Sequence, residues 1–287
     1  MSQRVAHVVA FALPGYAGSQ SMLDPHGPAA LAVYARPAAL VRHGEALINK
    51  FAFVLTPAAS SLQSSGQDRD LRELLLQSSR FAAYLTVPMV LTLVVMGDLI
   101  LLLWMGPQYE PGPVLALLAI GYFLPLTQRP AMQVLMGLNL HGWVAMTSLA
   151  MSSVGLALSY VLVNRLNLGL TGAAIAVAIP LTLSRGVFTA VHACRHLQIS
   201  LGEYARRTWL GPAACGVPFT LALVLGRSLG RGPVTDLLIG LAFGGAVLIP
   251  LYWRFGIPSS LRATIVRRLP RRLRPMMGGD RAAQSPA

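Results

Sequence analysis

Six stretches of this sequence are each long enough to cross a lipid bilayer and nearly free of charge. A hydrocarbon core about 30 Å thick needs about 20 consecutive apolar residues in a helix. Charged residues make up only 11% of the chain, whereas a soluble domain averages about a quarter. Such a chain cannot cover a globular surface with polar side chains, so lipid must form part of its surroundings. The six stretches are 80–104, 113–137, 142–163, 169–193, 209–228 and 233–253.

A seventh stretch, at about 28–62, has membrane length but carries several charges. We therefore predict an all-α integral membrane protein with about seven transmembrane helices, which form one bundle over 28–253. Residues 1–27 are expected to be the remnant of a preceding helix or an irregular segment. Residues 254–287 are expected to be a basic cytoplasmic tail, largely disordered.

Arginines are unevenly distributed among the predicted loops. If the loops alternate between the two sides of the membrane, one side collects fourteen arginines and the other collects three. Because basic loops stay in the cytoplasm, the richer side, which includes the C-terminus, is predicted to be cytoplasmic. Nucleic-acid binding is the alternative explanation for the arginine-rich tail. The tail directly follows an apolar segment, however, which favours contact with anionic lipids and no nucleic acid.

The stretch YARPAALVRHGEALINKFAF places several charges on a helix of membrane length. At about 100° per residue, a step of seven residues returns close to the same direction, so Arg36, His43 and Lys50 form one basic stripe. Arg42 and Glu45 lie three residues apart on another face, and we expect them to pair. The stripe fits two arrangements, a helix lying flat on an anionic membrane surface and a helix that lines a positively charged cavity.

Two arginines lie well inside predicted segments, Arg129 in 113–137 and Arg185 in 169–193. A charge at this depth costs at least about 2.5–3.5 kcal/mol, so such a residue faces a cavity, finds a partner or reaches the interface. Prolines recur near the middle of segments, which suits a transporter with broken helices, although ordinary kinks are the alternative. These prolines are Pro88, Pro125, Pro130, Pro180 and Pro218.

The sequence contains no recognisable catalytic, cofactor-binding or metal-binding motif. The two cysteines, Cys194 and Cys215, have the spacing of neither a metal site nor a disulfide framework. Neither a Gly-rich phosphate loop nor a nucleophile elbow occurs. We therefore expect no enzymatic activity, no cofactor and no metal.

Several short sequences resemble blocks of the polysaccharide and O-antigen flippases, a family of the multidrug/oligosaccharidyl-lipid/polysaccharide exporter superfamily. The run from GPAALAVYARPAALV to TPAASSLQSSGQDRDLRELLLQSSR is similar to a family junction in which a helix with a Pro-x-x-Ser-x-Leu end enters a short charged loop. LLWMGPQYEPG resembles the family's outward Trp-x-Gly-x-x-Tyr turn. QVLMGLNLHG and LGLTGAAIAVAIP resemble the blocks that follow. Order and spacing agree over about residues 27–200.

The resemblance implies alternating-access translocation of a lipid-linked oligosaccharide across the bacterial inner membrane. The family fold has two pseudo-symmetric six-helix bundles around a central, often cationic cavity. This chain corresponds to the C-terminal bundle only, so we expect a truncated or half-length chain that does not flip substrate alone. The implied partners are an undecaprenyl-linked glycan and a missing N-terminal half.

The expected mechanism is electrostatic attraction of the substrate phosphate into the cavity. Glu45 is a candidate for ion coupling, with the local pair to Arg42 as the alternative. The predicted substrate-binding residues are Arg36, His43, Lys50, Arg129 and Arg185.

Other functions remain open at this stage. A peptidoglycan-precursor flippase or a multidrug exporter of the same superfamily has a similar sequence pattern. A membrane glycosyltransferase or ligase needs paired acids or a large polar loop, whereas the chain has ten acidic residues in all and short loops. A non-catalytic membrane scaffold needs no basic residues facing one cavity.

Overall fold

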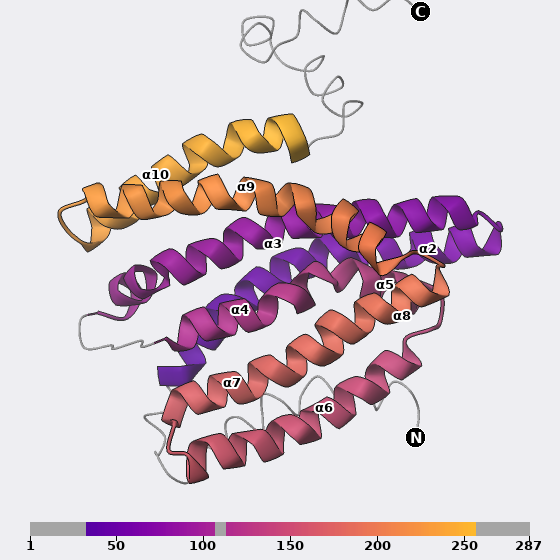
Figure 1. Cartoon of the computed structure of the whole chain (residues 1–287), viewed down its shortest axis with the longest axis horizontal. Helices are drawn as coiled ribbons and strands as arrows, with labels where there is room; N and C mark the ends of the chain where they lie inside the picture. Colours follow the sequence, from indigo (N-terminus) through magenta and orange to yellow (C-terminus); the bar gives the residue numbers. More distant parts are fainter. Residues whose placement is uncertain (1–32, 107–112, 257–287) are drawn as a thin grey trace, which may run out of the picture.

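The computed structural model describes residues 33–106 and 113–256 (Figure 1). All regular secondary structure in these ranges is helical, which confirms the predicted all-α fold. The expected N-terminal segment, 1–27, lies outside the described residues, as does the tail beyond residue 256.

The first described helical stretch, residues 33–53, is followed by a turn at Val54 and then by α2 (Leu55–Ser64). The other α-helices are α3 (Asp68–Met105), α4 (Val114–Thr127), α5 (Arg129–Gly137), α6 (Gly142–Tyr160), α7 (Gly169–Leu181), α8 (Thr189–His196), α9 (Leu201–Leu229) and α10 (Pro233–Leu251). Three π-helical segments continue α6, α7 and α10, namely η1 (Val161–Arg165), η2 (Thr182–Phe188) and η3 (Tyr252–Gly256).

Six helical runs in the described residues are long and apolar enough to cross a membrane, which defines a multi-pass membrane protein. Their mean hydropathy ranges from 1.2 to 2.3. The expected seventh helix is helical where it is described, but residues 33–53 carry four charged side chains and are not among the six. A membrane crossing by this helix therefore stays a prediction. The six runs are Asp68–Met105, Val114–Gly137, Gly142–Arg165, Gly169–His196, Leu201–Leu229 and Pro233–Gly256.

Two of the helices begin well before the apolar segments that predicted them. α3 begins at Asp68 rather than at about residue 80, because Asp68 and Asp70 in its first turn suit the positive end of the helix dipole. α9 begins at Leu201 rather than at about residue 209, because the Ser200 side chain accepts a hydrogen bond from the Glu203 backbone N–H at 3.2 Å. Helices therefore continue past the apolar span that a membrane criterion detects.

The helices pack as a row in the order α10, α9, α3, α4, α7 and α6 (Figure 1). One cluster of buried apolar side chains joins residues 33–53 to α3, α4 and α7, and includes Val41, Val90 and Leu118. A second cluster joins α3, α5, α8 and the start of α9, and includes Leu75 and Ala193. α6 and α10 stand at the two ends of the row and are the least buried of the six membrane-length runs.

Polar contacts join α3 to α9 and to η3. Arg207, near the start of α9, forms an ion pair with Glu73, near the start of α3, at 3.1 Å. Arg80 and the Tyr84 hydroxyl each donate a hydrogen bond to the Phe255 carbonyl in η3, both at 3.0 Å. The start of α3 and the start of α9 therefore lie together, whereas η3 contacts α3 nearer the middle of that helix. The cytoplasmic side stays a prediction.

Pro125 interrupts α4 and leaves a backbone carbonyl without its helical partner. Proline has no N–H, so Pro125 cannot donate to the carbonyl of Gly121, four residues earlier. The Thr182 hydroxyl, at the start of η2, donates to that carbonyl at 2.8 Å. Because water is absent from the hydrocarbon core, freed carbonyls there need such partners. The break in one helix is thus satisfied by its neighbour.

Pro88 in α3 creates the same problem at the Tyr84 carbonyl. The Tyr252 hydroxyl of η3 donates a hydrogen bond to it. The two tyrosine rings also meet edge to face, with centroids 5.0 Å apart. The end of α10 is therefore held against the middle of α3 by a group that the proline makes available.

We predict that Thr182→Val destabilises the protein by about 1–2 kcal/mol, because it leaves the Gly121 carbonyl without the hydroxyl donor. In a Pro125→Ala background the same change is expected to have a smaller effect, since the alanine N–H can donate to that carbonyl. Unfolding of the purified protein in mixed micelles measures both.

Thr147→Val is the matched control, because the Thr147 hydroxyl donates only within its own helix, to the carbonyls of Trp143 and Val144. Equal losses for Thr182→Val with and without Pro125 would contradict this account of the break.

Candidate functional site

Two neighbouring helices are interrupted at the same level, and each interruption carries an arginine. α4 ends at Thr127, and after Gln128 the next helix, α5, begins with Arg129; α7 passes into η2, which contains Arg185. Arg129 lies fifteen residues after the start of its helical run and Arg185 sixteen residues after the start of its own, or about 22 and 24 Å along each axis. The two breaks pack against each other, since α4 contacts η2.

The two interruptions share a short sequence repeat. Residues 125–129 read PLTQR, and residues 180–185 read PLTLSR. The second copy has one more residue between threonine and arginine, and η2 accommodates it with the wider π-helical turn, a feature frequent at functional sites. This repeat is visible in the sequence and was a usable signal for pairing the two arginines.

Arg129 forms an ion pair with Glu45 of the first helix. Both side chains are largely buried, at 9% and 15% exposure. The expected local pair between Arg42 and Glu45 is therefore wrong, because packing places the carboxylate against the start of α5. Taking both charges out of water is compensated only by close contact between them, which the pair provides.

Arg185 is half-buried and belongs to the same electrostatic environment. It lies close enough to Arg129 and to Tyr122 of α4 to interact with both. Tyr122 also interacts with Arg42 and with Tyr34. We call Arg129, Arg185 and Glu45 the cationic cluster, whose formal charge is +1, from two arginines and one carboxylate. Arg42 is exposed and is not part of it.

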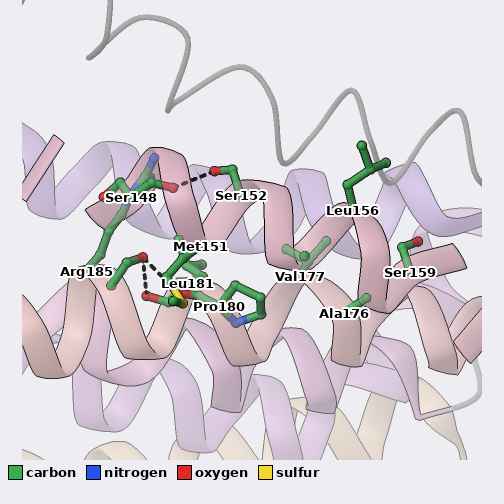
Figure 2. Close-up of a pocket in the computed structure, with 12 residues that line it drawn as sticks. Ser148, Met151, Ser152, Leu156, Ser159, Ala176, Val177, Pro180, Leu181 and Arg185 are labelled. Carbon is green, nitrogen blue, oxygen red and sulfur yellow. Dashed lines mark hydrogen bonds between the residues drawn. The ribbon is translucent and has the colours of Figure 1, made fainter. Parts of the chain in front are cut away.

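Arg185 also reaches one end of a groove between α6 and α7 (Figure 2). The groove and the open solvent at its mouth together occupy about 400 Å³. Ser148, Ser152 and Ser159 line it from one face of α6, and Ser184 lines it from η2. Figure 2 shows the Arg185 side chain extending from η2 toward α6 near Ser148.

The groove offers hydrogen-bond acceptors beside the arginine donor. Ser152 donates to the Ser148 carbonyl at 2.7 Å, and Ser184 donates to the Pro180 carbonyl at 2.8 Å. Their oxygens keep lone pairs with which to accept. Pro180 also removes the α-helical donor of the Ala176 carbonyl, which faces Gly155 across the groove. These acceptors suit O–H donors of water or of a sugar hydroxyl.

The basic stripe lies elsewhere on the first helix. Arg36, His43 and Lys50 are all exposed, and helix geometry turns them away from Glu45 by about 140–180°. Arg129, Arg185 and Glu45 are thus brought together, and the stripe is not part of their cluster. One cavity shared by the stripe and the buried arginines stays a prediction.

Sequence reasoning missed Gln128, which precedes Arg129, and Tyr204, which binds Gln128. The Tyr204 hydroxyl of α9 donates to the Gln128 side-chain oxygen at 2.6 Å, and both residues are almost fully buried. This bond fixes the residue before Arg129 and so orients the α4–α5 break. No local sequence pattern predicts this hydrogen bond, because the two residues are 76 positions apart.

Neither a metal nor a disulfide site forms among the described residues. Groups of three or more potential metal ligands are absent from that part of the chain. Cys194 and Cys215 are both buried and unbridged.

The fold and the cationic cluster define a multi-pass, all-α membrane protein with charged groups held between broken helices. A family model described as "Polysaccharide biosynthesis protein" matches residues 26–112, which confirms the family resemblance over that part of the chain. The match includes Glu45 and the basic stripe, whereas Arg129 and Arg185 lie beyond it. Neither a curated protein nor a solved structure matches the chain.

We predict that Glu45→Gln lowers the free energy of unfolding by about 3–5 kcal/mol, because it removes one partner of a buried ion pair. The double variant Glu45→Gln/Arg129→Gln is expected to lose much less than the sum of the two single variants. Unfolding in mixed micelles measures the free energies of the wild type, the two single variants and the double variant.

Glu73→Gln is the control, because the Glu73–Arg207 pair is exposed and is expected to contribute no more than about 1 kcal/mol. Additive losses at Glu45 and Arg129 would show that the two side chains do not interact.

Proposed function

We propose that this protein translocates lipid-linked oligosaccharide or polysaccharide precursors across the bacterial inner membrane. The observation that carries the proposal is the pair of broken helices, each with an arginine inside a run of membrane length. Residues 26–112 of the same chain match a polysaccharide biosynthesis family. Broken helices at the membrane midplane are where transporters bind charged substrates.

The proposed ligand contact is between the arginines and the phosphate of an undecaprenyl-linked glycan. A guanidinium at this depth costs at least about 2.5–3.5 kcal/mol on insertion scales, so its retention favours a functional role. Arginine binds phosphate through two parallel hydrogen bonds, which gives both strength and orientation. Arg129 and Arg185 are the proposed primary contacts, and the stripe of Arg36, His43 and Lys50 is proposed to guide the anion towards them.

The proposed activity is transport without covalent chemistry. Translocation requires a change in access and an environment that matches the charge and shape of the substrate. A cytoplasmic C-terminus, with its arginines near anionic lipids, follows from the basic side of the bundle. A missing N-terminal half remains the proposed partner that completes the cavity.

We predict that deleting this chain from its host leaves lipid-linked glycan in the inner leaflet. The measurement is lectin access to the glycan in spheroplasts. Wild-type chain, returned to the deletion strain in which its proposed partner is still expressed, is expected to restore outward exposure. Arg185→Gln is expected to reduce the restored rate by about tenfold or more, since a charge-assisted contact is worth about 1.5–3 kcal/mol.

Arg185→Lys keeps the charge and is expected to fall between the two. The matched control is Arg195→Gln, which changes an exposed arginine at the end of α8. An unchanged leaflet distribution in the deletion strain would falsify the proposed function.

A further inference from the structure

Glu45 is an acidic group in a place where acids are scarce. The chain has ten acidic and twenty-three basic residues. The Glu45 side chain is largely buried beside Arg129, at the break between α4 and α5. Because burial disfavours every charge, a carboxylate there needs a partner that compensates for the loss of water.

The ion pair between Glu45 and Arg129 means that any anion that binds Arg129 must compete with Glu45. A guanidinium that engages one carboxylate in close contact has fewer N–H donors for a second anion, so a ligand must compete with Glu45. A single negative charge can only replace the charge that leaves. An anion with two or more charges can also interact with Arg185, which is an electrostatic neighbour of Arg129.

The formal charge of the cluster favours the same class of ligand. Arg129 and Arg185 together carry +2, so an anion of charge −2 neutralises both arginines once Glu45 has left Arg129. With Glu45 in place the net charge is +1, whereas without Glu45 the site would carry +2 and would hold singly charged anions more readily.

We propose that Glu45 is a specificity-determining residue, an internal anion that occupies Arg129 until a ligand with at least two negative charges displaces it. The inference rests on the proposed function, because it assumes that Arg129 and Arg185 receive the substrate anion. Glu45 lowers the apparent affinity for every anion, since only the fraction of molecules with Arg129 released can bind. Singly charged anions then fail to bind at concentrations at which a multiply charged ligand binds.

The test measures thermal unfolding of the purified full-length chain in detergent at constant ionic strength. The probes are inorganic pyrophosphate and acetate. Wild-type Tm is expected to rise with pyrophosphate and not with acetate. For Glu45→Gln, the apparent Kd for pyrophosphate is expected to fall by about tenfold or more, and acetate is expected to raise Tm.

Glu45→Asp keeps the charge with a shorter side chain, so it remains informative if Glu45→Gln does not fold. Its apparent Kd for pyrophosphate is expected to fall by a smaller factor than that of Glu45→Gln. Glu73→Gln, at the exposed pair with Arg207, is expected to behave as wild type. In an Arg129→Gln background, Glu45→Gln is expected to leave the pyrophosphate response unchanged, since Glu45 acts through Arg129.

Two results would overturn the inference. An unchanged Kd in both Glu45 variants would make the ion pair purely structural, and a weaker pyrophosphate response would make Glu45 part of the ligand contact. The proposed function is judged separately by the leaflet distribution and by Arg185→Gln. Normal glycan transport with an unchanged Kd would therefore reject the role of Glu45 and leave the transport function standing.

Discussion

The need to satisfy backbone carbonyls in lipid determines how the helices of this protein pack. Proline removes the helical donor of the carbonyl four residues earlier, and no water in the hydrocarbon core replaces it. Thr182 supplies the donor for the carbonyl that Pro125 frees, and Tyr252 does so for the one that Pro88 frees. Each bond joins two helices, so the prolines decide which neighbours must lie against each other.

The same interruptions place the charged groups. The α4–α5 break ends with Arg129, and the π-helical turn that follows α7 contains Arg185. Because α4 contacts η2, two arginines from separate helices reach one electrostatic environment. A pair of straight helices would satisfy every carbonyl internally and would have no need of these side-chain bonds. The breaks therefore connect backbone hydrogen bonding to the position of the cationic cluster.

The helix of residues 33–53 has one buried face, which carries Glu45, and one exposed face, which carries the basic stripe. Its buried face contributes Val41 and Ile48 to the core and Glu45 to the pair with Arg129. Its exposed face carries Arg36 and His43. A buried ion pair requires a partner within contact distance, whereas exposed cations are stabilised by solvent or by lipid headgroups. This division explains why the stripe of Arg36, His43 and Lys50 is exposed while the Glu45 side chain on the opposite face is largely buried.

Sequence alone determined the membrane class, the position of six apolar spans, the family resemblance and the presence of Arg129 and Arg185 within five residues of a proline. Hydropathy, period and local motifs are properties of consecutive residues, so they can be read without a structure. Tertiary structure decided the partners. The pairing of Glu45 with Arg129 instead of Arg42, the Thr182–Gly121 bond across 61 positions and the Tyr204–Gln128 bond across 76 depend on which helices become neighbours. No periodicity within one helix specifies that choice, since it follows from packing and from the donors that broken helices require.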